Sequence, residues 1–157
     1  MRAKYWLVGA VIATGLSVGL GLEASASTPD ASSSASGSFT FQSDYTNVLA
    51  RGISSEISQL TYSGTLAGIA IDRGTENTYA NGSFTGTGTE YCAACTIGDA
   101  SGAFTATYIY WGSGNTYSGA ETFTQGFGKL AGLVGGGSFK GNVQTNANSY
   151  EYTYSLP

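Results

Sequence analysis

Apolar and aromatic residues alternate with polar ones along most of the chain after residue 38. No stretch keeps the i, i+3, i+4, i+7 spacing of a helix for more than about two turns. Threonine, tyrosine, phenylalanine and glycine dominate, as they do in strands joined by tight turns. Eight short strands at close spacing predict an all-β domain, an eight-stranded antiparallel closed barrel of the calycin type. The predicted strands are residues 38–46, 57–63, 65–72, 82–91, 101–111, 116–126, 129–140 and 148–156.

Glycine-containing pairs and runs mark the predicted turns between these strands. The chain has two prolines, Pro29 and Pro157, so no predicted strand loses a backbone donor to proline. The predicted turns are Arg73-Gly74, Asn81-Gly82, Gly98-Asp99, residues 112–115 and residues 135–137.

The first 26 residues have the parts of an export signal. Arg2 and Lys4 form a positive start, residues 7–22 are an apolar run, and the Ala-Ser-Ala run at 24–26 suits a signal peptidase. We predict a signal peptide at residues 1–26, a secreted or periplasmic protein, and no membrane span after cleavage. An uncleaved membrane anchor is the alternative, which the short and glycine-rich run disfavours.

Residues 27–38 are rich in serine and alanine and carry no large apolar side chain. Such a segment cannot bury enough surface to offset the entropy that ordering removes, so we predict a flexible linker there. The barrel domain is then predicted to occupy residues 39–157.

The charge balance and the absence of histidine exclude several classes of function. The chain has six basic residues, ten acidic residues and no histidine, which gives a net charge of −4 at pH 7. Nucleic-acid binding needs a basic face, so no nucleic-acid partner is expected. Without histidine, a Ser/His/Asp triad, a Cys/His pair and an imidazole metal site are all excluded. We expect no metal and no cofactor.

Cys92 and Cys95 are the two cysteines of the chain, separated by two alanines. In an exported protein this pair predicts one disulfide, placed at the tip of a loop between strands. A redox-active pair is the first alternative, but residues 96–99 do not continue as the helix that would activate a thiolate. Metal ligation is the second, but two thiolates without histidine fall short of four ligands.

A glycine-rich motif in the second half of the chain carries a family resemblance. Residues 126–139 read GFGKLAGLVGGGSF and follow GAETFT at 119–124. Supporting motifs are SFTGTGT at 83–89, GDASGAFT at 98–105 and YEYTY at 150–154. On these motifs the chain resembles the allene-oxide-cyclase-like and dirigent-like barrels, and most of all a bacterial branch known as a domain of unknown function. Phe127 stands where that motif usually has threonine.

The resemblance spans residues 58–156 and implies the same eight-stranded closed barrel. It says less about function, because such barrels include plant cyclases, proteins that steer phenoxy-radical coupling and bacterial polyketide cyclases. The shared motif is a glycine hairpin, so it transfers no catalytic residue. Relatives are often dimers or trimers, and a homo-oligomer is left open.

Three predicted strands each place aromatic residues on one face by simple alternation. The first face holds Phe104, Ala106, Tyr108 and Tyr110, the second Tyr117, Glu121, Phe123 and Phe127, and the third Tyr150, Tyr152 and Tyr154. An eight-stranded barrel is either filled by its own side chains or holds one small ligand, and both interpretations stay open. If the barrel is hollow, the candidate residues for binding a small apolar or aromatic molecule are Phe104, Tyr108, Tyr110, Tyr117, Phe123, Tyr152 and Tyr154.

Glu121 and Glu90 are the candidate catalytic residues. Glu121 alternates onto the face of Tyr117 and Phe123, and Glu90 shares a face with Phe84. A carboxyl buried among aromatic rings has a raised pKa and can act as a general acid or base. The alternative for each is a solvated or hydrogen-bonded structural role.

The sequence therefore predicts an exported small barrel that encloses a small apolar or aromatic molecule. One alternative is an isomerase or cyclase that acts inside the cavity. Another is a non-catalytic surface protein that binds glycans through exposed aromatic residues such as Trp111.

Overall fold

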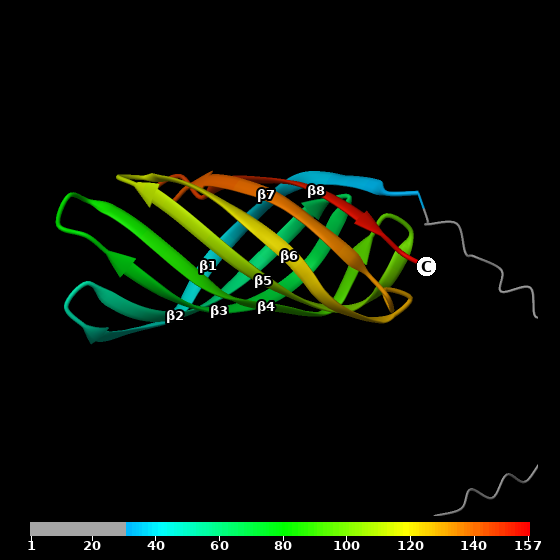
Figure 1. Cartoon of the computed structure of the whole chain (residues 1–157), viewed down its shortest axis with the longest axis horizontal. Helices are drawn as coiled ribbons and strands as arrows, with labels where there is room; N and C mark the ends of the chain where they lie inside the picture. The colour runs from blue at the N-terminus through cyan, green and yellow to red at the C-terminus, as the bar shows by residue number, and fades with distance from the viewer. Residues whose placement is uncertain (1–30) are drawn as a thin grey trace, which may run out of the picture.

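Eight antiparallel strands form a closed barrel in chain order, each paired with the next and β8 paired with β1 (Figure 1). The computed structural model describes residues 31–157, and the predicted signal peptide lies outside them. The predicted all-β, eight-stranded antiparallel barrel is confirmed. Within the described range, no helix is both long and apolar enough to span a membrane. The strands are β1 (Ser33–Ala50), β2 (Ile53–Gly64), β3 (Leu66–Thr78), β4 (Ser83–Ile97), β5 (Ala100–Ser113), β6 (Thr116–Gly128), β7 (Val134–Asn142) and β8 (Ala147–Ser155).

Strand β1 begins at Ser33, inside the segment that we predicted to be a flexible linker. Residues 33–39 pair with β8, with Ser33 opposite Tyr154. Ala35 is 2% exposed and belongs to the core. The linker prediction is therefore wrong for residues 33–38, because backbone pairing that closes the barrel orders a segment whose side chains alone would not.

Two of the predicted turns lie inside strands. Arg73-Gly74 is in the middle of β3, which pairs with β2 on one side and β4 on the other. The chain reverses at the other predicted turn of this region, Asn81-Gly82. Residues 135–137 lie in β7, and the turn before that strand is at 129–133. These glycines allow neighbouring strands and side chains to approach the backbone closely. At Gly136 (φ 154°), for example, a Cβ would overlap the carbonyl oxygen of a β6 residue.

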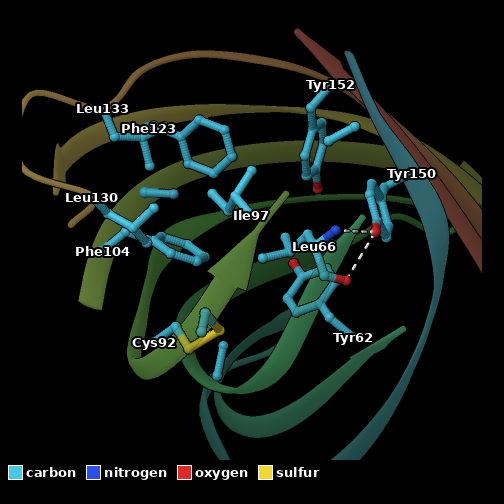
Figure 2. Packing of buried hydrophobic residues seen from close by; sticks show 14 of the residues in the cluster. Tyr62, Leu66, Cys92, Ile97, Phe104, Phe123, Leu130, Leu133, Tyr150 and Tyr152 are labelled. Carbon is cyan, nitrogen blue, oxygen red and sulfur yellow. Dashed lines mark hydrogen bonds between the residues drawn. A yellow bond between two sulfur atoms is a disulfide. The ribbon is translucent and has the colours of Figure 1, made fainter. Parts of the chain in front are cut away.

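Side chains fill the end of the barrel that holds the C-terminus, at the right of Figure 1. Leu66 and Leu130 are 0% exposed there (Figure 2). The rings of Phe104 and Phe123 meet edge to face with centroids 5.3 Å apart. The hydroxyl of Tyr150 accepts a hydrogen bond from the Leu66 N–H (2.8 Å) and donates one to the Leu66 carbonyl (2.9 Å). This end is thus an apolar core whose buried hydroxyl is satisfied.

The predicted disulfide between Cys92 and Cys95 is present, but it lies within β4 and not at the tip of a loop. Residues three apart on a regular strand point to opposite faces. Here Cys92 pairs with Phe104 and Cys95 with Gly102, so β4 carries one residue more than β5 over this stretch. That bulge turns both sulfurs inward, and the two cysteines are 0% and 1% exposed. The bridge therefore locks a bulge in the wall of the filled end.

Replacing both cysteines by alanine is expected to lower the free energy of unfolding by about 2 kcal/mol. The bridge joins residues with a sequence separation of 3, and in the chain-entropy model so short a loop constrains the unfolded chain only modestly. Urea unfolding of the oxidised protein and of the double variant checks the value. The wild type unfolded in reducing agent is the control, and an unchanged midpoint in both would contradict a stabilising bridge.

Candidate functional site

The opposite half of the barrel is hollow. A cavity of about 250 Å³ lies between the inward faces of the strands and reaches Val143 in the turn between β7 and β8, a residue that is 44% exposed. The interior is therefore filled at one end and hollow at the other. The aromatic lining consists of Phe39, Phe41, Phe84, Phe139, Tyr62, Tyr108, Tyr110, Tyr117 and Tyr152. The acidic lining consists of Glu56, Asp72, Glu76, Glu90 and Glu121.

Glycines on neighbouring strands make room for the rings around the cavity. A Cβ on Gly86 of β4 would overlap the ring of Tyr110 on β5. A Cβ on Gly119 of β6 would overlap the ring of Phe139 on β7. Each ring therefore packs on the backbone of a glycine, which is the alternation of small and large residues found in small barrels. This arrangement leaves the centre of the barrel open.

Glu90 and Glu121 lie deep in the cavity and are 2% and 4% exposed. The Tyr62 hydroxyl donates to Oε2 of Glu90 (2.9 Å), and the Tyr152 hydroxyl donates to Oε2 of Glu121 (2.6 Å). Oε1 of each carboxyl is buried and has no hydrogen-bond partner among the described residues. A buried oxygen left unpaired costs free energy, so both atoms are sites where a partner would be favourable.

Burial raises the pKa of both carboxyls. The pKa of Glu90 is well above its ordinary value because of desolvation first and then the negative charge of Glu121. Desolvation also raises the pKa of Glu121, to about 7, although the hydrogen bond from Tyr152 opposes the shift. Near neutral pH the pair therefore keeps at least part of its protons, and the site holds a carboxylic acid beside a carboxylate.

Three more acids lie nearer the open end. Asp72 accepts a hydrogen bond from the Ser58 N–H (2.9 Å), and burial together with the charge of Glu56 raises its pKa to about 7. The Tyr110 hydroxyl donates to Oε2 of Glu76 (3.0 Å). In the described part of the chain, no group of acids and cysteines is placed to hold a metal ion. The site can exchange protons and hydrogen bonds with a bound molecule.

The fold has a solved counterpart. A crystal structure of a protein of unknown function from the DUF3224 family, from Shewanella oneidensis, matches with a TM-score of 0.68 and 16% sequence identity, over 81% of this chain and 98% of that one. At this identity the likeness shows the fold alone. No protein-family model matches the chain, and a search of the curated proteins finds no match. The resemblance to allene-oxide-cyclase-like barrels stays a prediction.

The structure separates the predicted site residues into two groups. Tyr108, Tyr110, Tyr117 and Tyr152 line the cavity, together with both candidate catalytic residues, Glu90 and Glu121. The other three predicted ligand-binding residues do not line it: Phe104 and Phe123 are in the filled end, and Tyr154 packs against that core. Trp111, the basis of the glycan-binding alternative, is 51% exposed and also lies outside the cavity lining.

Phe127 does not share the inward face of Phe123, contrary to the alternation expected from the sequence. On β5, Ala106 pairs with Phe123 and the preceding Thr105 pairs with Gln125, so Thr124 is an extra residue on β6. The bulge reverses the alternation after Phe123. Phe127 is therefore on the outer face and 41% exposed.

Sequence reasoning missed Glu56 and Glu76, near the open end, because the strands there are longer than predicted. Glu56 precedes the predicted strand at 57–63, and Glu76 follows the false turn at Arg73-Gly74. The signal that could have found them is the alternation itself, which continues as Glu56, Ser58, Leu60 and Tyr62 along β2.

Proposed function

We propose that this barrel, exported from the cell, binds one small apolar or aromatic molecule in its open half. The observation that carries the proposal is the cavity of about 250 Å³ with two buried carboxyl oxygens that lack partners. Such a volume lies just below the usual range of ligand pockets, about 300–1,000 Å³, and suits a single ring system. Aromatic walls supply the contact area, and Glu90 and Glu121 supply the polar atoms that orient the ligand.

Two weaker observations favour the exported location and the family. A disulfide persists in oxidising compartments, as outside the cytosol. The closed eight-stranded barrel is also the architecture that a member of the allene-oxide-cyclase-like or dirigent-like group would have.

Chemical-shift mapping with phenol and with indole tests the proposal. We expect amide shifts on the cavity-facing parts of β2, β3 and β5, and none around Leu66 and Leu130 in the filled end. Shifts gathered around Trp111 would instead favour the surface-binding alternative. No shifts from either probe at millimolar concentration would contradict binding of a small aromatic molecule in the cavity.

The paired carboxyls favour a second candidate function, an isomerase or cyclase that acts in the same cavity. Glu121, with a pKa of about 7, is divided between its acid and base forms near neutral pH, which is the condition for efficient proton transfer in either direction. Native mass spectrometry of protein from its own host would identify the bound molecule, and incubation would then show whether it is converted. We expect Glu121→Gln not to convert the molecule even at concentrations that saturate the variant; conversion at the wild-type rate would contradict the catalytic role.

A further inference from the structure

The cavity is acidic and has no basic counter-charge. Five carboxyl groups line it, and no lysine or arginine of the described chain is among its lining residues. The basic residues between 31 and 157 are Arg51, Arg73, Lys129 and Lys140, and all four are exposed. A concave site lined by charge of one sign concentrates its field, here a negative one. Anionic ligands are disfavoured inside this barrel.

At the deep end of the cavity the polar atoms without a partner are carboxyl oxygens, which accept hydrogen bonds when the carboxyl is ionised. The hydroxyls of Tyr62, Tyr110 and Tyr152 already donate to Glu90, Glu76 and Glu121. What is left at the deep end is Oε1 of Glu90 and Oε1 of Glu121, both buried and unpartnered. A protonated amine has three N–H donors and no acceptor, so its hydrogen-bonding groups match these two atoms.

The walls also suit a cation. The rings of Tyr108 and Tyr110 have centroids 6.2 Å apart and are nearly parallel, and Tyr117 meets Tyr110 edge to face at the same centroid distance. Tyrosine faces attract a cation through their quadrupole, more strongly where water is removed. The cavity thus offers two carboxyls at its floor, which are negatively charged when ionised, and aromatic rings along its side.

We propose that the ligand of this cavity is a small aromatic or apolar molecule that carries a protonated amine. The ammonium group lies at Glu90 and Glu121, and the apolar part lies against Tyr108, Tyr110 and Phe84. This inference rests on the proposed binding function and names its ligand class. No covalent step is involved.

Binding of such a cation should be linked to proton release. The ionisable acids that face the site are Glu56 on β2, Asp72 and Glu76 on β3, Glu90 on β4 and Glu121 on β6, with the five lining tyrosines. Burial raises the pKa of Glu90, Glu121 and Asp72, so the empty cavity holds protons at mildly acidic pH. An ammonium ion favours the ionised carboxylates, and affinity is therefore expected to rise with pH while the amine stays protonated.

Three probes that share one ring test the charge requirement: 2-phenylethylamine, 2-phenylethanol and phenylacetate. At about pH 7.5 we expect calorimetry to give the amine at least roughly tenfold higher affinity than the alcohol, and no binding of the acid. The affinity of the amine should fall about tenfold or more between about pH 8 and about pH 5, and the affinity of the alcohol should change little.

Variants without one carboxyl separate the contribution of that carboxyl to amine binding from effects on ligand binding in general. Glu121→Gln and Glu90→Gln each keep the shape of the side chain and remove its charge. Each variant is therefore expected to bind the amine more weakly than the wild type and to bind the alcohol with unchanged affinity. Glu151→Gln is the matched control, because Glu151 is exposed on β8. Equal or tighter binding of the alcohol would overturn the amine inference and leave the proposed binding function standing. If none of the three probes binds, the amine inference is overturned as well. The chemical-shift mapping with phenol and indole then decides the proposed binding function independently.

Discussion

The free energy of unfolding is expected to fall by several kcal/mol as the pH rises from about 4.5 to about 7.5. In the unfolded chain Glu90 and Glu121 ionise near their ordinary value of 4.5, whereas burial raises both pKa values in the folded protein. Between these values the unfolded state binds fewer protons than the folded state, so stability decreases as the pH increases. For Glu121, whose pKa rises to about 7, the loss is about 3 kcal/mol at about 1.4 kcal/mol per pKa unit. Glu90 and Asp72 act in the same direction.

Urea unfolding at a series of pH values measures this effect. Glu121→Gln is expected to flatten the profile, because the amide cannot ionise, and to leave the protein more stable than the wild type above neutral pH. Glu151→Gln removes the same charge from an exposed position and should keep the wild-type slope. A wild-type stability that is constant, or greatest above pH 7, would contradict a buried acidic pair.

Phe104→Ala is expected to cost about 3–5 kcal/mol of stability. Phe104 is 0% exposed and meets Phe123 edge to face, so its removal leaves a cavity in the filled end of the barrel. Phe127→Ala is the matched control: the sequence pattern placed that ring inside as well, but it is 41% exposed and should cost only about 0.5 kcal/mol.

Thermal or urea unfolding of both variants decides the point. A Phe104→Ala protein no less stable than Phe127→Ala would mean that the filled end is not closely packed. A large loss of stability in Phe104→Ala, with unchanged ligand-induced chemical shifts in the open half, would agree with a barrel whose two ends have separate roles.

The number of strands could be predicted because its signals are local, and closure of the barrel was predicted from the count of eight strands and from the family resemblance. Alternation along each strand and Asn81-Gly82 or Gly98-Asp99 at the turns are readable without knowing the partners. A glycine that lets a neighbouring side chain or strand approach closely, such as Gly74 within β3, cannot be distinguished in the sequence from a glycine in a turn. That ambiguity shortened the predicted third strand and hid Glu76.

Bulges were the second obstacle. An extra residue at Thr124, or between Cys92 and Cys95, is defined only against the partner strand, yet it reverses which side chains face inward. The sequence could nominate Glu90 and Glu121 one by one from their apolar neighbours. That they lie near one another follows from the tilt and register of β4 and β6, which are not adjacent strands.

A carboxyl NMR titration of protein labelled with ¹³C at glutamate tests the central claim, that two buried acids near one another face the cavity. Glu90→Gln and Glu121→Gln assign the two resonances. The account predicts that both titrate well above the ordinary glutamate value of 4.5, and that removing either acid lowers the apparent pKa of the other. Two independent titrations at the ordinary value would contradict it.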